Sequence, residues 1–301
     1  MPSDPSVPGP ETAPGGDRPA SVPSAPRIDA HQHFWAYSAR EYPWIARGME
    51  RLARDYLPRD LAPAAAAEGI AGTVAVQARQ SLEESRWLLG LATAEPLVWG
   101  VVGWVDLCGD RVGDDLEGLA ANAAFVGVRH VVQDEPDARF VLREDFVRGL
   151  RHLPRHGLTY DLLIVPHQLP AAGELAALLP EQRFVIDHAA KPRIAAGDRA
   201  DWARDIRAVA RHDNVFCKVS GLVTEAARNA WNRATFIPYL EIVLESFGPG
   251  RLMFGSDWPV CLLAGTYAEV AAIPRAFFAG LSPGEQAMIW GGTAARFYGL
   301  T

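Results

Sequence analysis

The sequence predicts a closed (β/α)₈ barrel, and two observations carry that prediction. Eight short apolar runs rich in β-branched residues recur along the chain, with stretches of helical character between them. The first run starts at residue 27 and the last at residue 251, so 224 residues cover seven steps, a mean of 32. That period is the size of one βα unit. Alternating strands and helices favour a parallel sheet, and eight such units favour a barrel.

The expected elements follow from these runs in chain order. The expected strands are residues 27–33, 72–78, 98–106, 125–132, 158–164, 183–189, 214–220 and 251–257. Among the stretches between them, three read clearly as helices: 60–69, which is rich in alanine, 81–95, and 202–212. In the last of these, Trp202, Ile206 and Val209 recur at the spacing of one helical face.

An open, doubly wound sheet is the competing architecture, because strand number alone does not show closure. Such a sheet usually carries a glycine-rich nucleotide-binding turn after its first strand. Here that place holds HQHFW, residues 31–35. The barrel is therefore the preferred fold.

Length and composition indicate one large folded domain. The chain has 301 residues, 49% of them hydrophobic, and a net charge of −7, which argues against nucleic acid and anionic membrane surfaces as partners. No run reaches the 18 or so apolar residues of a membrane helix. A small-molecule substrate is the expected partner. The sequence is also compatible with a homo-oligomer.

The amino-terminal 26 residues differ from the rest. They contain eight prolines and no apolar segment of the kind found in secretory signals, so we expect a disordered tail at 1–26 and one domain at 27–301. The three cysteines, Cys108, Cys217 and Cys261, are few and widely spaced. They predict reduced thiols in a cytoplasmic protein rather than a disulfide framework.

Chemically able side chains fall where the expected strands end, which is where barrel enzymes place their active sites. The first strand ends in His31 and His33, and residues two apart on a strand share a face. The sixth strand ends in His188, in phase with Ile186, and the eighth in Asp257. Each has an ordinary alternative, such as a structural hydrogen bond or a helix cap. Convergence of all four at one barrel mouth favours a functional site.

Other polar or aromatic residues near strand ends are candidates for substrate binding. Lys218 binds a substrate carboxylate or pairs with Asp187 or Asp161, and Trp35 either faces the mouth or packs the long loop after the first strand. The full candidate set is Arg129, His130, Gln77, Trp35, Trp104, Asp161 and Lys218.

Several stretches resemble one family. DAHQHFW (29–35), GVRHVVQDEPD (127–137), DHAAKP (187–192), KVSGLVTEA (218–226) and FGSDWPVC (254–261) are similar to motifs of the amidohydrolase superfamily. The closer similarity is to its sugar-lactonase group, which includes L-fuconolactonase-like and L-rhamnonolactonase-like proteins. The resemblance runs from about residue 27 to the end of the chain. It implies a distorted (β/α)₈ TIM barrel.

The resemblance also implies a catalytic set and bears on the metal. His31, His33, His188 and Asp257 correspond to the family's site residues. Binuclear members add a Lys or Glu on the fourth strand and a His on the fifth, and here those strands read VGVRHVV and TYDLLI. A two-metal site is therefore not expected. One divalent ion, Zn²⁺ or Mn²⁺, held by His31, His33, His188 and Asp257 fits the residues, and so does a metal-independent scheme.

The expected activity is hydrolysis of a lactone, with an aldono-lactone as the substrate class. Asp257 is the expected general base toward water, its pKa open to elevation by burial, and the three histidines polarise the carbonyl. A metal-dependent decarboxylase of the same superfamily is the alternative enzyme. A non-catalytic sugar-binding barrel is the alternative outside enzymes.

Overall fold

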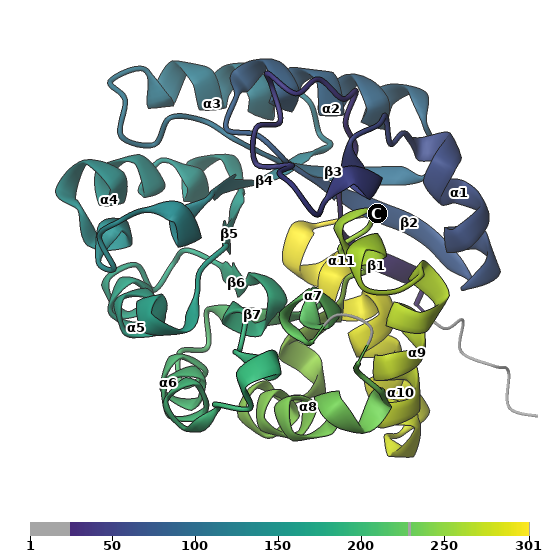
Figure 1. Cartoon of the computed structure of the whole chain (residues 1–301). Coiled ribbons are helices and arrows are strands. Elements are labelled where there is room, and N and C mark those ends of the chain that lie inside the picture. Colours follow the sequence, from purple (N-terminus) through teal and green to yellow (C-terminus); the bar gives the residue numbers. More distant parts are fainter. Residues whose placement is uncertain (1–24, 228–229, 301) are drawn as a thin grey trace, which may run out of the picture.

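The computed structural model describes residues 25–227 and 230–300, so residues 1–24 of the expected tail lie outside the described part of the chain. Eight strands form one sheet in the order β1 to β8, and all seven neighbouring pairs are parallel. The strands form a ring with the helices around its outside (Figure 1). The predicted (β/α)₈ barrel is confirmed.

The strands lie within or close to the expected ranges, but several are shorter. They are β1 (Arg27–Gln32), β2 (Ile70–Val76), β3 (Val98–Gly103), β4 (Phe125–His130), β5 (Thr159–Leu162), β6 (Phe184–Ile186), β7 (Val215–Val219) and β8 (Leu252–Phe254). The α-helices are α1 (Pro58–Ala67), α2 (Leu82–Ala94), α3 (Val112–Ala120), α4 (Glu144–Leu150), α5 (Leu169–Leu178), α6 (Ala200–Val209), α7 (Leu222–Glu225), α8 (Arg233–Phe247), α9 (Tyr267–Phe277), α10 (Pro283–Ala287) and α11 (Thr293–Tyr298).

The ring closes between β1 and the segment that follows β8. The backbone N–H of Asp257 donates to the carbonyl oxygen of His31 at 2.8 Å, and that of His33 donates to the carbonyl of Trp258 at 2.7 Å. The closing bonds therefore involve the same residues that the sequence marks as functional. The residues that close the barrel are therefore also residues of the candidate site.

A register shift in β1 determines the side of the sheet to which His31 and His33 point. The three steps from Asp29 to Gln32 are matched by only two steps of β2, Thr73–Ala75. One extra residue of this kind moves the side chains that follow it to the opposite face of the sheet. Consequently His31 and His33 point into the barrel, whereas simple alternation would place them on the same side as Asp29.

The barrel interior is apolar at the amino ends of the strands and charged above that. Side chains of six strands pack there with α11, whose Phe297 and Tyr298 fill this end of the barrel. The buried interior residues are Ile28, Ala30, Val74, Val76, Val102, Val126, Val185 and Met253. The polar side chains therefore gather toward the opposite, carboxyl end of the strands.

Two further features bear on the sequence predictions. Among the described residues, every helix is too short or too polar to cross a bilayer. Cys108, Cys217 and Cys261 are free thiols, and the last two are buried.

Candidate active site

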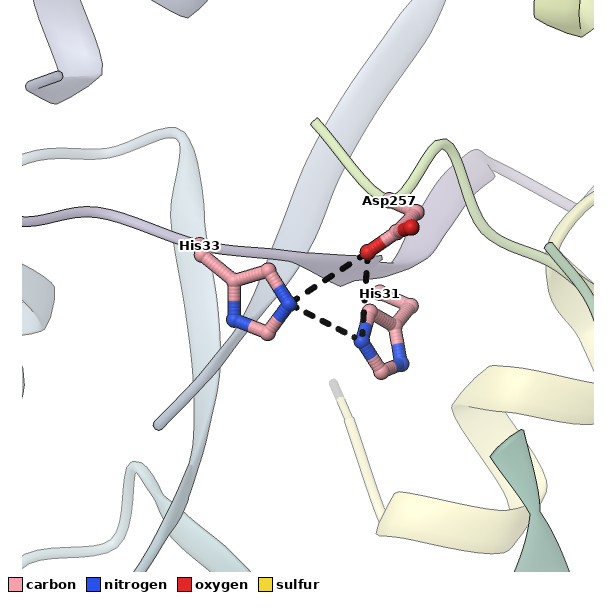
Figure 2. Close-up of side chains that lie close together, drawn as sticks. All are labelled: His31, His33 and Asp257. Carbon is pink, nitrogen blue, oxygen red and sulfur yellow. Dashed lines mark hydrogen bonds and ion pairs between the residues drawn. The ribbon is translucent and has the colours of Figure 1, made fainter. Parts of the chain in front are cut away.

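The four predicted site residues come together at the carboxyl ends of β1, β6 and β8. Nε2 of His31 lies 3.2 Å from Nε2 of His33, and Oδ1 of Asp257 lies 3.4 Å from the His33 nitrogen (Figure 2). Nε2 of His31 and Nε2 of His188 are each 3.9 Å from the same carboxylate oxygen. All four side chains are buried, with exposures between 0% and 5%.

His188 reaches the site by a route that strand alternation does not predict. Strand β6 ends at Ile186, which faces the helices, and the next residues leave the strand. Residues 188–191 all have positive φ, from 50° to 59°, and form a left-handed turn. The expected phase of His188 with Ile186 is therefore wrong, and the turn brings its ring into the mouth.

Asp257 is held by backbone geometry and by a buried carboxylate that the sequence analysis missed. Its φ is 57°, in the left-handed region, and its carbonyl accepts from the N–H of Cys261 at 2.8 Å. Oδ1 of Asp29 accepts from the backbone N–H of Ser256 at 2.8 Å and from that of His31 at 3.1 Å. Asp29 thus ties the two segments that carry the site together.

Hydrogen bonds fix the proton on one imidazole and orient another. Nδ1 of His33 lies 2.8 Å from the carbonyl oxygen of Val76, which can only accept, so Nδ1 carries the proton of the neutral ring. The Nε2 lone pair of His33 then faces the site. Nδ1 of His188 lies 2.8 Å from Oγ of Ser220, a group that can donate or accept.

Burial keeps the imidazoles of His31 and His188 neutral, and Asp257 beside them is ionised. Desolvation lowers the pKa of His31 well below its usual value and that of His188 to about 4. Burial also opposes ionisation of Asp257, but the neighbouring His188 and His31 outweigh it and lower its pKa well below the usual range. Burial could have raised the pKa of Asp257, but its pKa is lowered, and the group is a carboxylate at neutral pH.

A layer of buried ionic groups lies beneath this cluster. Nζ of Lys218 is 2.5 Å from Oδ2 of Asp161 and 3.0 Å from Oδ1 of Asp187, so both carboxylates pair with it. Arg129 donates from Nη1 to Oδ2 of Asp187 at 3.0 Å. The hydroxyl of Tyr298 donates to Asp161 at about 2.9 Å, which joins the layer to α11. Apart from Tyr298, these side chains come from strands β4, β5 and β7 and from the residue after β6.

The remaining substrate-binding candidates separate into two groups. Trp104 and His130 are half-buried, with the indole N–H 3.5 Å from Nδ1 of His130, whose Nε2 lies 2.7 Å from Glu135. Gln77 and Trp35 are fully buried. The Gln77 amide donates to the carbonyl of Arg129.

Trp35 packs the long loop rather than facing the opening. Its indole N–H donates to the carbonyl of Arg54 at 2.8 Å, and its ring contacts those of Tyr42, Trp44 and Tyr56. Of the two interpretations left open by the sequence, the structure matches the packing one.

The side chains present fit one divalent metal ion. A tetrahedral zinc centre with bonds of about 2.0–2.1 Å separates its ligands by about 3.3–3.4 Å. The spacings among His31, His33 and Asp257 run from 3.2 to 3.9 Å, close to that requirement. The donor set of imidazole and carboxylate suits Zn²⁺ and Mn²⁺. His188, whose ring centroid lies 4.5 Å from that of His31, completes the group.

Fold and cluster together define the class of the protein, a (β/α)₈-barrel hydrolase with a histidine–aspartate centre. The family model described as amidohydrolase matches residues 28–300, and the chain belongs to the amidohydrolase family. The family expected from the sequence motifs is thus confirmed.

Similar proteins of named activity give the chemical context. A protein named L-fucono-1,5-lactonase from Burkholderia multivorans is 44% identical over 285 residues, covering 91% of this chain and 96% of its own. Another of that name, from Burkholderia ambifaria, is 38% identical over 276 residues, covering 90% and 95%. A crystal structure of a Burkholderia multivorans amidohydrolase with bound zinc has a TM-score of 0.86 and 44% identity, covering 92% of this chain and 100% of that one.

Proposed function

We propose that this protein hydrolyses a sugar-derived lactone, an aldono-1,5-lactone of the L-fucono type. The observation that carries the proposal is one ionised carboxylate, Asp257, facing three imidazoles at the mouth of a barrel. The two relatives named L-fucono-1,5-lactonase support the substrate class.

In this proposal Asp257 is the general base. Its carboxylate takes a proton from a water molecule as the water oxygen bonds to the lactone carbonyl carbon. When the ring C–O bond breaks, the same proton passes from Asp257 to the departing ring oxygen, which yields the open hydroxy acid. A low pKa makes Asp257 a weak base, so its fixed position beside the water has to supply much of the rate.

The three histidines have different roles, because their protons are placed differently. His33 keeps its proton on Nδ1 at the Val76 carbonyl, so its Nε2 offers only a lone pair to the site. His31 and His188 are therefore the imidazoles that can donate a hydrogen bond to the developing oxyanion. The expectation that all three histidines act alike does not follow from this geometry.

One divalent ion, Zn²⁺ or Mn²⁺, would be held by His31, His33 and Asp257 with His188 beside them. When bound, such an ion polarises a carbonyl and lowers the pKa of a water ligand toward about 7. The roles of the chain's own groups stay the same: His33 presents a lone pair, and Asp257 presents a carboxylate.

The polar groups at the mouth supply the substrate contacts in this proposal. Trp104 and His130 lie half-buried beside it, with His130 oriented by Glu135 and stacked on Phe140. Arg129, Gln77, Asp161 and Lys218 are buried and already paired with other groups of the chain, and we assign them to holding the site together.

The test is hydrolysis of a panel of aldono-1,4- and 1,5-lactones, followed with a pH indicator before and after chelation. We expect turnover of a 1,5-lactone above the uncatalysed rate, and a kcat lower by about 10²–10⁴ in Asp257→Asn. Loss of activity on chelation with recovery on adding Zn²⁺ or Mn²⁺ would establish the metal. Aromatic carboxylates, assayed for carbon dioxide release, test the decarboxylase alternative. The proposal fails if no lactone is hydrolysed with or without metal.

A further inference from the structure

Nδ1 of His31 has two competing neighbours in the barrel interior. Nζ of Lys218 lies 3.0 Å away in hydrogen-bonding geometry. Oδ1 of Asp187 lies 3.3 Å away; this oxygen is ion-paired with Nζ of Lys218 at 3.0 Å, but no described residue donates to it in hydrogen-bonding geometry. One neighbour can only donate and the other, as a carboxylate, can only accept. The choice between them therefore decides which nitrogen of His31 carries the proton.

Lys218 is held firmly in the donating position. Its side chain is fully buried, and its ammonium also donates to Oδ2 of Asp161 at 2.5 Å. Asp161 is fixed in turn by the hydroxyl of Tyr298, about 2.9 Å away. A buried ammonium has to use its protons within the protein, and the lone pair of His31 Nδ1 is one of its few acceptors.

With Lys218 donating to Nδ1, the neutral His31 ring carries its proton on Nε2. That nitrogen faces the site, 3.2 Å from Nε2 of His33. Because His33 keeps its own proton on Nδ1 at the Val76 carbonyl, its Nε2 is ready to accept. Donors and acceptors therefore match from Lys218 to Val76. Nη1 of Arg129, which can only donate, lies 3.4 Å from Nε2 of His31 and favours the other tautomer, but Lys218 is the closer donor to the ring. In this state His31 is a hydrogen-bond donor toward the site.

The opposite tautomer of His31 also has a hydrogen-bond partner. If the proton lies on Nδ1, it can be donated to Oδ1 of Asp187, the buried oxygen that otherwise lacks a hydrogen bond. The other oxygen of Asp187 is held by Arg129 at 3.0 Å, so the carboxylate is already in place. Nε2 of His31 then has a lone pair, which Nη1 of Arg129 faces at 3.4 Å, and a lone pair on this nitrogen is what a metal ligand requires.

We propose that Lys218 and Asp187 are positioning residues that select the tautomer of His31. Lys218 favours the Nε2–H form, a donor to the lactone oxyanion, and Asp187 favours the Nδ1–H form, a metal ligand. The ring stays neutral in both forms, since one proton leaves Nε2 and one is taken up at Nδ1. The assignment of a catalytic role to the donor form rests on the proposed lactonase activity. The selection of the tautomer by Lys218 and Asp187 is independent of that activity.

The direct test is ¹⁵N NMR of histidine-labelled protein after chelation and again with Zn²⁺ added. Signals of His31 are assigned by their loss in His31→Gln. Without metal we expect a protonated Nε2 and an unprotonated Nδ1 on His31, and with Zn²⁺ the reverse. A His31 ring protonated on Nδ1 in the chelated protein would overturn the proposal.

Two variants should move zinc affinity in opposite directions. Asp187→Asn removes the carboxylate that supports the ligand form, so we expect the Zn²⁺ dissociation constant to rise about tenfold. Lys218→Met alone would leave Asp161 buried and unpaired, so it is made together with Asp161→Asn and compared with Asp161→Asn alone. Both changes together keep the interior net charge constant. The double variant Lys218→Met/Asp161→Asn should bind Zn²⁺ more tightly than Asp161→Asn alone, and a larger fraction of its His31 should be in the Nδ1–H form.

These measurements separate two kinds of failure. The tautomer and the zinc affinity are read without turnover, so a protein that hydrolyses no lactone can still show the predicted proton positions. In that case the proposed function fails and the positioning role stands. If both variants weaken zinc binding and leave the tautomer unchanged, the two residues are merely structural and the inference is wrong.

Discussion

The indole N–H of Trp202 donates to the carbonyl oxygen of Ala189 at 2.7 Å, and this bond fastens the left-handed turn that carries His188. Trp202 lies on α6, thirteen residues further along the chain, and is buried. A second bond, from the N–H of Lys191 to the carbonyl of His188 at 2.9 Å, closes the turn itself. Four successive left-handed residues that are not glycine need support of this kind.

Replacing Trp202 by phenylalanine should weaken both the fold and the site. The Ala189 carbonyl loses its donor in a buried place, which costs about 1–3 kcal/mol of unfolding free energy. The turn then relaxes and His188 moves away from Asp257, so kcat should fall more than the stability loss alone predicts. Urea unfolding and lactone kinetics on the same preparation check the two effects.

Trp99→Phe is the matched control. Trp99 also donates its indole N–H to a backbone carbonyl, that of Pro96 at 3.1 Å, but this contact is exposed and far from the site. We expect little change in either quantity. Equal losses of kcat in the two variants would show that the bond to Ala189 does not position His188.

Ala190→Gly should be tolerated although Ala190 is fully buried. Its φ of 59° costs an L-residue about 1–2 kcal/mol, which glycine avoids. The relief roughly offsets the lost methyl group and the greater chain entropy of glycine. Ala75→Gly loses the same methyl from a buried strand position without any relief. We therefore expect Ala75→Gly to be less stable in urea than Ala190→Gly by about 1–2 kcal/mol, and equal stabilities would contradict strain in the turn.

The fold and the main site residues were predictable because they depend on local pattern. Alternation of apolar runs with helical stretches predicts the barrel, and strand ends predict where His31, His33 and Asp257 lie. The face of the sheet toward which each strand-end side chain points was harder to predict. The register shift in β1 and the left-handed turn after β6 are set by neighbouring strands and by Trp202, which no short window of sequence contains.

The supporting carboxylates were beyond local pattern for a related reason. Asp29 holds Ser256 across 227 residues of sequence, and Asp187 meets Arg129 across 58. The sequence analysis treated Asp187 only as a pairing partner for Lys218, and the structure confirms that pairing. Its position between Lys218, Arg129 and His31 depends on three strands meeting in the barrel.

Glu84 predicts a pH dependence of stability that is separate from the catalytic cluster. Its buried carboxylate accepts from the backbone N–H groups of Ala78 and Arg79 and from the hydroxyl of Tyr42. Burial raises its pKa from 4.5 to about 7. The folded protein therefore holds this proton more tightly than the unfolded chain does. The contribution to stability is complete below about pH 4.5 and is lost as the pH rises to about 7.

Glu84→Gln should remove that dependence. The amide oxygen still accepts from the backbone, but nothing titrates, so the stability of the wild type relative to the variant should fall by up to about 3 kcal/mol between pH 4.5 and 7.5. Urea unfolding at several pH values measures the difference. Glu83→Gln, a change at the exposed neighbouring position, should follow the wild-type pH profile. A wild-type advantage that does not vary with pH would refute the assignment.

Asp257→Asn tests the base itself. The asparagine side chain has the same shape but cannot take the proton from water or return it to the ring oxygen, so we expect kcat to fall by about 10²–10⁴. Because the backbone bonds of residue 257 to His31 and Cys261 remain, the melting temperature should stay near the wild-type value. Asp106→Asn, an exposed change just past β3, controls for loss of a carboxylate near a strand end, and its kcat should match the wild type. Turnover by Asp257→Asn within about tenfold of the wild type would show that another group is the base. His33 would be the first candidate, because its Nε2 lone pair lies 3.4 Å from the Asp257 carboxylate.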